Sequence, residues 1–201
     1  MKLILGSSSK YRKEILEKAG YVFDVMIPNV DEKLIKEDDP YKRPLVLARA
    51  KADALVEEIK EPSLVITSDV VVICNGKLYE KPESENEARK FLKEYSKGVV
   101  PKAICAIVVT NTETKEKFEG TDTAKVFFKP FSDSMLEEFI KHGEPLTRAG
   151  GFGIQHPIMS PHVDKLEGAE DTIVGLSLNL LKRLLKQTKI EYKLLRKEGV
   201  L

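Results

Sequence analysis

A serine-rich and basic segment near the start of the chain has the composition of an anion-binding turn. It reads Gly6-Ser7-Ser8-Ser9-Lys10-Tyr11-Arg12-Lys13 and follows an apolar stretch. Free backbone N–H groups and the positive end of a helix dipole favour an anion at such a turn, and the guanidinium of Arg12 can bind a phosphate at two points. The alternative is an ordinary strand–turn–helix in which Ser9 caps the helix. The nucleotide-binding pattern G-x-x-x-x-G-K-[ST] does not occur.

Two acidic positions could hold a cation or activate water. Asp69 follows Ile66-Thr67-Ser68 inside an apolar stretch, where a carboxylate is costly unless it is paired. Its carboxylate could bind Mg²⁺ or orient an attacking water molecule. Glu32 lies in a polar stretch and could add a second carboxylate. The alternatives are a strand-end aspartate with local hydrogen bonds and a solvated loop residue.

Two lysines and one glycine-rich segment complete the set of candidates. Lys51 lies in an expected helix, and Lys81 lies in Glu80-Lys81-Pro82. Both are compact charges suited to neutralising phosphate, although each could instead be a solvated surface lysine. The glycines of 149–155 would let the backbone approach a ligand closely, and the amide of Gln155 can donate to and accept from a base edge.

Alternating strand and helix patterns would position these residues. Hydrophobic periodicity, capping residues and turn residues predict strands over 2–6, 22–27 and 64–74, a hairpin at 75–76 that returns through 77–79, strands over 103–110 and 121–128, and helices over 10–19, 44–59, 84–95, 132–143 and 174–185. Strands alternate with helices early and pair through hairpins later, which favours a mixed α/β sheet with flanking helices. Such folds bind ligands beyond the carboxyl ends of the strands.

Composition excludes several classes of function. The chain has 33 Lys and Arg against 32 Asp and Glu, so its net charge of +1 argues against a protein that binds duplex nucleic acid mainly through charge. The longest apolar run, 103–109, is too short to span a membrane, and the apolar stretch near the N-terminus is too short for a signal peptide. Cys74 and Cys105 lie in apolar runs and are expected to be buried, reduced thiols. We therefore expect a cytoplasmic protein without a nucleic-acid or membrane partner.

In combination, these segments resemble one family much more specifically than any of them does alone. In chain order they read G-S-S-S-K-Y-R-K-E-I-L, D-E, L-A-R-A-K-A, S-D-V-V-V, E-K-P and A-G-G-F-G-I-Q. This order resembles the Maf family of nucleoside-triphosphate pyrophosphatases over residues 2–186. The resemblance implies a mixed twisted sheet in two lobes around a central cleft, as in the inosine-triphosphate pyrophosphatases. It also implies one domain over 1–187, followed by a charged tail over 188–201.

The same resemblance implies an activity and a role for each candidate residue. The activity is hydrolysis of a nucleoside triphosphate to the monophosphate and pyrophosphate, a house-cleaning reaction that uses a divalent cation, Mg²⁺ or Mn²⁺. Homodimers are common in the family, although no apolar stripe in the sequence identifies an interface. The matching positions are Ser7 and Arg12 for phosphate binding, Lys51 and Lys81 for the phosphate-facing lysines, Asp69 for the proton acceptor, Glu32 with Asp69 for the metal, and Tyr11, Val70 and Gln155 for base discrimination.

The positions that match base discrimination do not agree on one base. Tyr11, in place of the family's usual arginine, resembles the branch that prefers 7-methylguanosine triphosphate. Gln155 after Gly-Ile resembles the branch that takes dTTP and UTP, but His156-Pro157 follows it where a glycine is expected. Val70 matches neither branch. We hypothesise that Tyr11 stacks on the base, since an aromatic face favours a purine or a cationic methylated base.

Two other classes of function compete with hydrolysis. One is a nucleotide-binding regulator of cell division that has lost catalysis and acts through protein partners. The intact set of Glu32, Lys51, Asp69 and Lys81 argues against it. The other is a nucleic-acid-binding protein, which the near-zero net charge and the aromatic content of 7% disfavour. The hydrolase interpretation requires that the serine–arginine turn, both lysines and both acids line one crevice.

Overall fold

The computed structural model describes residues 1–190, so most of the tail expected over 188–201 lies outside the described residues. The chain divides into two compact units. The first unit comprises 1–69, 105–122 and the chain from 174 onward, and the second comprises 70–104 and 123–173.

The strands form a mixed sheet, as the sequence predicts. Within residues 1–190 the strand order is β2-β1-β3-β5-β6-β7, and β4 pairs with β3. The pairs β1–β2 and β1–β3 are parallel, whereas β3–β4 and β6–β7 are antiparallel. The strands are β1 (Lys2–Gly6), β2 (Asp24–Met26), β3 (Ser63–Cys74), β4 (Lys77–Tyr79), β5 (Lys102–Asn111), β6 (Lys117–Phe128) and β7 (Val163–Glu167).

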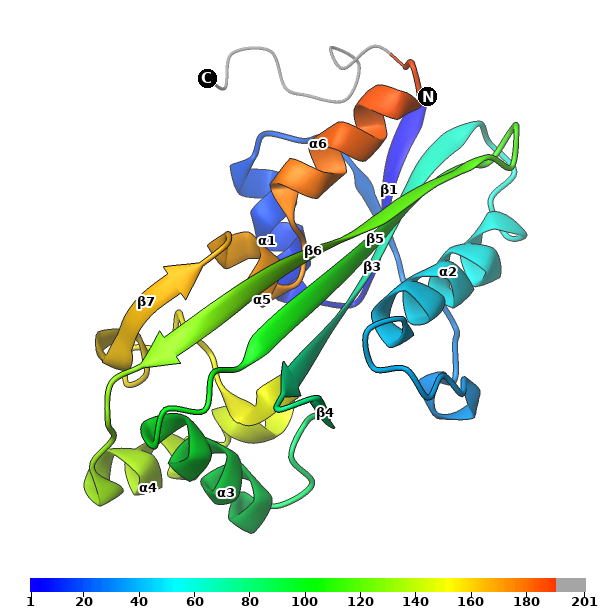
Figure 1. Cartoon of the computed structure of the whole chain (residues 1–201). Coiled ribbons are helices and arrows are strands. Elements are labelled where there is room, and N and C mark those ends of the chain that lie inside the picture. Colours follow the sequence, from blue (N-terminus) through cyan, green and yellow to red (C-terminus); the bar gives the residue numbers. More distant parts are fainter. Residues whose placement is uncertain (191–201) are drawn as a thin grey trace. The chain divides into compact units, whose positions relative to one another are not determined.

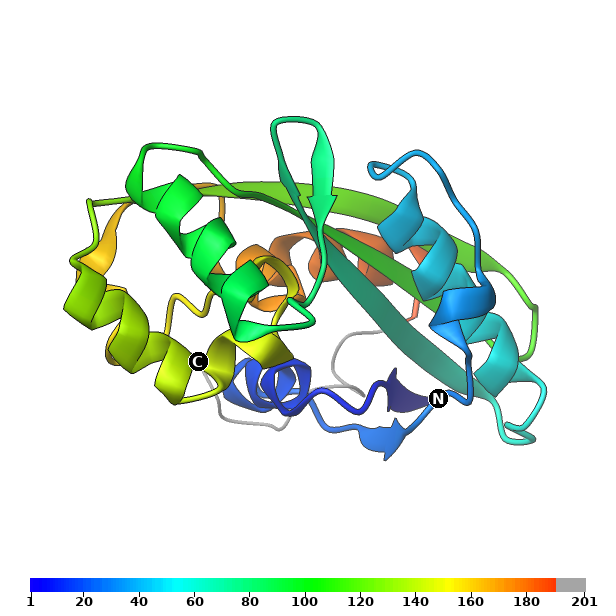
Figure 2. The same ribbon diagram turned by 90° about the horizontal axis from the view of Figure 1, so that it is seen from below.

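Helices flank these strands in both units. In the first unit, α1 and α6 lie on one side of β1 and β3, and α2 lies on the other side (Figure 1). In the second unit, α3 and α4 pack against each other (Figure 2). The α-helices are α1 (Lys10–Lys18), α2 (Arg43–Val56), α3 (Glu85–Ser96), α4 (Asp133–Lys141), α5 (Glu170–Val174) and α6 (Leu178–Gln187), and the short 3₁₀ turns are Glu32–Leu34, Glu144–Thr147, Ala149–Gly151 and Ser160–His162.

Local signals account for several boundaries. The Ser9 hydroxyl oxygen caps α1 by accepting from the backbone N–H of Arg12, and Ser84 caps α3 in the same way. Asn75 and Gly76 have φ values of 49° and 76°, which the tight turn between β3 and β4 requires. These predictions from the sequence are confirmed.

The predicted helix over 174–185 is wrong at its start. The helix α6 begins at Leu178, because Ser177 caps it and Gly175 has φ of 117°. A short helix, α5, ends at Val174 instead. The strand β7, which is short and mostly polar and pairs with the end of β6, was not predicted from the sequence.

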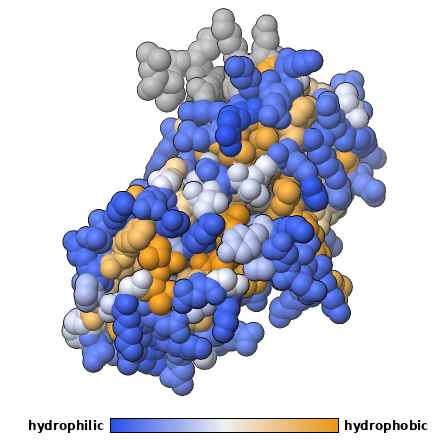
Figure 3. Space-filling model, viewed as in Figure 1, coloured by the Kyte–Doolittle hydropathy of each residue, from blue (hydrophilic) through white to orange (hydrophobic). Residues whose placement is uncertain are grey.

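Each unit has its own apolar core. In the first unit, α2 and the central strands bury aliphatic side chains that include Leu55, Leu64 and Ile66. In the second unit, an aromatic cluster is formed by Tyr79, Phe91, Tyr95, Phe128 and Phe152. Both cysteines are free and buried, as predicted. On the face in Figure 3, hydrophilic residues surround small hydrophobic patches. Among the described residues, every helix is too short or too polar to cross a membrane.

Candidate active site

The candidate site of the first unit lies where β1 ends and β3 continues. Gly6 pairs with Thr67 at the end of the parallel β1–β3 ladder, and Ser68 and Asp69 follow on β3. A Cβ atom at Gly6 would lie 2.6 Å from Leu55 Cδ1 and 2.7 Å from Thr67 Cγ2. Glycine therefore lets the end of β1 pack closely against α2 and β3. The site lies at the carboxyl end of a parallel strand, as expected for such folds.

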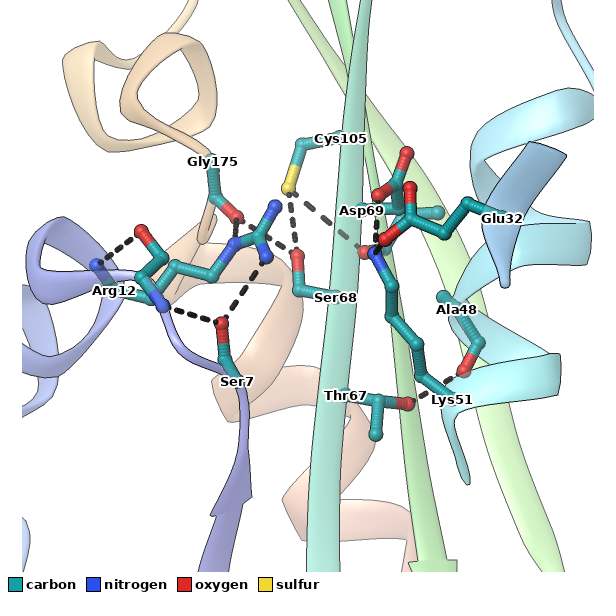
Figure 4. A network of polar contacts seen from close by, with 12 residues as sticks. Ser7, Arg12, Glu32, Ala48, Lys51, Thr67, Ser68, Asp69, Cys105 and Gly175 are labelled. Carbon is teal, nitrogen blue, oxygen red and sulfur yellow. Dashed lines mark hydrogen bonds and ion pairs between the residues drawn. The ribbon is translucent and has the colours of Figure 1, made fainter. Parts of the chain in front are cut away.

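A buried lysine connects the two predicted acids on the α2 side of β3. Lys51 Nζ lies 2.6 Å from Asp69 Oδ1 and 2.9 Å from Glu32 Oε1 (Figure 4). The side chains of Lys51 and Asp69 are only 9% and 10% exposed, whereas that of Glu32 is 49% exposed. The alternative of a solvated surface lysine is therefore wrong for Lys51. Its charge is held between two carboxylates.

The environment of Asp69 favours its protonated form more than water does. Burial raises the pKa of its carboxyl group above the ordinary value, and the carboxylate of Glu32 acts in the same direction. The charges of Lys51 and Arg12, together with the hydrogen bond from Lys51, oppose the rise. The Oδ2 atom has no hydrogen-bond donor among residues 1–190. Thus Oδ1 of Asp69 is bound to the ammonium group of Lys51, and Oδ2 can accept a hydrogen bond from a ligand or water.

Arg12 extends from the first turn of α1 on the other side of β3. Its Nη1 atom donates to Ser7 Oγ at 3.2 Å, and its Nε atom donates to the carbonyl oxygen of Gly175 at 2.9 Å (Figure 4). Ser7 Oγ also accepts from the backbone N–H of Ser9. The Nη2 group has no acceptor in the described part of the chain. The guanidinium is held on two edges and keeps donors for an anion.

Ser68 and Gly175 also belong to this network, and neither was among the residues predicted from the sequence. Ser68 Oγ donates to the carbonyl oxygen of Gly175 at 2.8 Å and lies 3.6 Å from the sulfur of Cys105. Ser68, Gly175 and Cys105 are all buried. A serine in a run of buried β-branched residues was the available signal for Ser68. Nothing in the sequence indicated that it would pair with a carbonyl group more than a hundred residues away.

The first unit brings together five of the predicted residues: Ser7, Arg12, Glu32, Lys51 and Asp69. Tyr11 is half-buried on α1, and Lys10 Nζ lies 4.8 Å from the centre of its ring.

The remaining predicted residues belong to the second unit. Val70 is half-buried on β3, and Lys81 is exposed just after β4. Gln155 is exposed, and its Nε2 group donates to Glu170 Oε1 at 2.7 Å. Their assigned roles stay predictions, as do those of the predicted residues in the first unit.

The glycines of 149–153 are explained by packing within the second unit. Gly150 has φ of 72°, and a Cβ atom there would lie 2.9 Å from Val72 Cγ1. A Cβ atom at Gly151 would lie 3.0 Å from Pro82 Cγ, and one at Gly153 would lie 2.8 Å from Arg148 Nε. The close approach that these glycines permit is therefore to neighbouring side chains.

The donor set of Asp69 and Glu32 is compatible with a hard divalent cation. Mg²⁺ is usually bound through one or two carboxylates together with phosphate oxygens of the substrate. Within residues 1–190, no group of three or more His, Cys, Asp and Glu side chains is arranged to hold a metal ion alone. A cation at these two carboxylates would need oxygens from the substrate or from water.

Comparisons with known proteins identify a family, two groups of relatives and a protein of similar fold. A family model described as Maf-like protein matches residues 2–188. The chain is 42% identical to a 7-methyl-GTP pyrophosphatase of Dictyostelium discoideum over 92% of this chain and 96% of that protein. It is 37% identical to a dTTP/UTP pyrophosphatase of Clostridium perfringens over 94% and 98% of the two chains. The Ham1 protein of Staphylococcus aureus is similar in fold, with a TM-score of 0.53, 14% identity and coverage of 94% and 100%.

Proposed function

Since this chain belongs to the Maf-like protein family, we propose that it is a nucleoside-triphosphate pyrophosphatase. It hydrolyses its substrate to the monophosphate and pyrophosphate and so removes particular nucleotides from the cellular pool. The relatives in both groups above are named as pyrophosphatases and align over nearly their whole length. We propose that residues 1–187 act as one functional domain in the cytoplasm.

One observation in the structure carries this proposal. Lys51 is buried between Asp69 and Glu32, and Arg12 is close enough to lower the pKa of the Asp69 carboxyl group. A polyanionic substrate needs cationic groups, and attack by water needs a carboxylate that can accept a proton. Both kinds of group are concentrated at the end of β1. A purely structural ion pair would not require a neighbouring arginine with unused donors.

The reaction assigns a task to each of these side chains. Asp69 orients a water molecule through Oδ2 and accepts its proton as the oxygen attacks the α-phosphorus. The bond from that phosphorus to the bridging oxygen breaks, and pyrophosphate leaves with the bonding electron pair. Burial, which raises the pKa of Asp69, makes the carboxylate a stronger base than it is in water. Arg12 and the N–H groups at the start of α1 neutralise charge on the phosphates.

A divalent cation, Mg²⁺ or Mn²⁺, would be held by Glu32 and Asp69. It would supply positive charge against the phosphate oxygens as charge develops on the leaving pyrophosphate. Lys51 keeps the two carboxylates near each other, because its ammonium group binds both.

The base preference is proposed from the relatives and from three positions. The relative at 42% identity is named for 7-methyl-GTP, and Tyr11 supports a purine or a methylated base through stacking. The dTTP/UTP relatives and Gln155 support a pyrimidine. Val70 favours neither a purine nor a pyrimidine.

Lys81 is proposed to bind phosphate, and a homodimer stays a prediction from the resemblance.

The experiment that tests the proposed function is a release assay over a panel of triphosphates. Purified protein is incubated with 7-methyl-GTP, dTTP, UTP and the ordinary nucleotides, each with Mg²⁺, with Mn²⁺ and with EDTA. We expect pyrophosphate release from at least one nucleotide with a cation and almost none with EDTA. Binding of nucleotides without release from any of them would instead support the regulator without catalysis.

A further inference from the structure

The carbonyl oxygen of Gly175 accepts two buried hydrogen bonds from different parts of the first unit. Arg12 Nε donates to it at 2.9 Å, and Ser68 Oγ donates to it at 2.8 Å. The two donors approach from α1 and from β3, as Figure 4 shows. A carbonyl oxygen has two lone pairs, so these donors saturate it. Ser68 and Arg12 are therefore linked through one backbone atom.

The backbone fixes the direction of this carbonyl group. Gly175 has φ of 117°, a value that residues other than glycine rarely adopt. Two residues later, Ser177 caps α6 by accepting from the backbone N–H of Leu180 at 3.2 Å, and its hydroxyl donates to Asp122 Oδ2 at 2.5 Å. The turn before α6 is thus held at Gly175 by the two hydrogen bonds to its carbonyl oxygen, and at Ser177 by the two hydrogen bonds of its hydroxyl group.

The result for Arg12 is a guanidinium in one defined orientation. Its Nε and Nη1 groups are bound to Gly175 and Ser7, and its Nη2 group has no acceptor within residues 1–190. Arginine loses substantial rotamer freedom when an anion immobilises it. An arginine that is already held on two edges loses less, so it binds an anion more tightly.

We propose that Ser68, acting through the carbonyl oxygen of Gly175, is a positioning residue for Arg12. Ser68 does not touch the phosphates. It holds the acceptor that orients the guanidinium, and thereby increases the affinity of Arg12 for a polyphosphate chain. Ser68 also stands next to Asp69 on β3, so one short segment of strand orients a cationic group on one side and a carboxylate on the other. This inference rests on the proposed function for the identity of the anion.

A double-mutant cycle tests this link. Four proteins are compared: wild type, Ser68→Ala, Arg12→Ala and the double variant. The measurements are the affinity for inorganic tripolyphosphate by calorimetry, and kcat and KM with the best nucleotide. The tripolyphosphate measurement does not depend on turnover. Thr112→Val is the matched control, because Thr112 is a buried residue of the first unit whose hydroxyl donates to the carbonyl oxygen of Glu61 at 3.2 Å, away from Arg12.

We expect Ser68→Ala to weaken tripolyphosphate binding by about three- to tenfold, the usual range for one lost hydrogen bond. KM should rise by a similar factor. In the Arg12→Ala background the same change should have almost no further effect, because the group that it positions is gone. Thr112→Val should lower stability but leave the affinity unchanged. If Ser68→Ala does not fold, Ser68→Cys replaces it, since a thiol is only a weak donor. This variant is measured under reducing conditions, because the sulfur of Cys105 lies 3.6 Å from Ser68 Oγ.

Three results would overturn the inference. The first is an equal loss from Ser68→Ala in the presence and absence of Arg12, which would indicate a general structural effect. The second is unchanged affinity in Ser68→Ala. The third is a wild-type protein that does not bind tripolyphosphate. By contrast, tripolyphosphate binding that depends on Ser68 and Arg12, without hydrolysis of any nucleotide, would support the inference and refute the proposed function.

Discussion

Replacing Lys51 with methionine should destabilise the protein strongly, because it leaves Asp69 as a buried carboxylate without its cation. The two side chains are 9% and 10% exposed, and their charged atoms are 2.6 Å apart. Removing one partner of a buried ion pair typically costs about 3–5 kcal/mol. A domain of this size is stabilised by about 5–15 kcal/mol in total. The change should therefore remove a large share of the free energy of unfolding.

The loss should depend on pH in a defined direction. Burial already raises the pKa of Asp69 in the folded protein, and Lys51 is the strongest of the influences that oppose this rise. Without Lys51 the folded pKa rises further above that of the unfolded chain. The folded state then binds more protons than the unfolded state between these two pKa values. Stability is therefore highest below the unfolded pKa and falls as pH rises toward the folded pKa, with a slope of at most about 1.4 kcal/mol per pH unit.

Urea denaturation of the full chain between pH 5 and pH 8 measures both effects. Lys117→Met is the matched control, because Lys117 pairs with Asp53 at the more exposed surface of the same unit, where an ion pair contributes about 0–1 kcal/mol. A second substitution, Asp69→Asn, should restore part of the stability of Lys51→Met, since it removes the uncompensated charge. A loss of stability in Lys51→Met no greater than that in Lys117→Met, or a loss that becomes smaller as pH rises, would contradict this prediction.

Three further changes have expected outcomes. Tyr11→Arg should shift the ratio of kcat/KM for 7-methyl-GTP and UTP toward UTP, and an unchanged ratio would eliminate stacking by Tyr11. Gly150→Ala should lower stability in thermal unfolding by about 1–3 kcal/mol, because φ is 72° and the added Cβ would lie 2.9 Å from Val72 Cγ1; an unaltered melting temperature would contradict this packing role. Cys74 and Cys105 should not react with Ellman's reagent until the protein is denatured, since both are buried and burial raises the pKa of Cys74 to about 11; rapid labelling of the native protein would show that this picture of the core is wrong.

The parts of the fold that could be predicted are those with local signals. Ser9 caps α1, Ser84 caps α3, and Asn75 with Gly76 makes the turn between β3 and β4. Each signal acts within a few residues, so the sequence alone contains it. The start of α6 was predicted too early. The apolar pattern of the helix continues through Gly175, but the backbone of Gly175 is not helical, since its φ is 117°. The strand β7 was missed since its sequence, Val-Asp-Lys-Leu-Glu, has little alternation and its pairing with β6 is a tertiary effect.

The candidate site was predictable as a set of residue types but not as an arrangement. A lysine in the sequence of α2 looks like any surface lysine, and only the packing of α2 against β3 buries Lys51 beside Asp69. The carbonyl oxygen of Gly175 has no signature in the sequence at all. Its role depends on a turn that lies 163 residues from Arg12 and 107 residues from Ser68. Side-chain chemistry can be inferred from composition and order, whereas backbone acceptors appear only once the chain has folded.

Product identity in a single turnover experiment tests the central claim most directly. Wild-type protein and Asp69→Asn are incubated with the preferred triphosphate and a divalent cation, and phosphorus NMR follows all products. We predict equal amounts of nucleoside monophosphate and pyrophosphate from wild type. The Asp69→Asn protein should remain folded, because Lys51 keeps its ion pair with Glu32, and it should be slower by about 10²–10⁴-fold, the range expected for loss of a general base. Nucleoside diphosphate and inorganic phosphate as the products, or nearly normal turnover in the folded variant, would contradict the account.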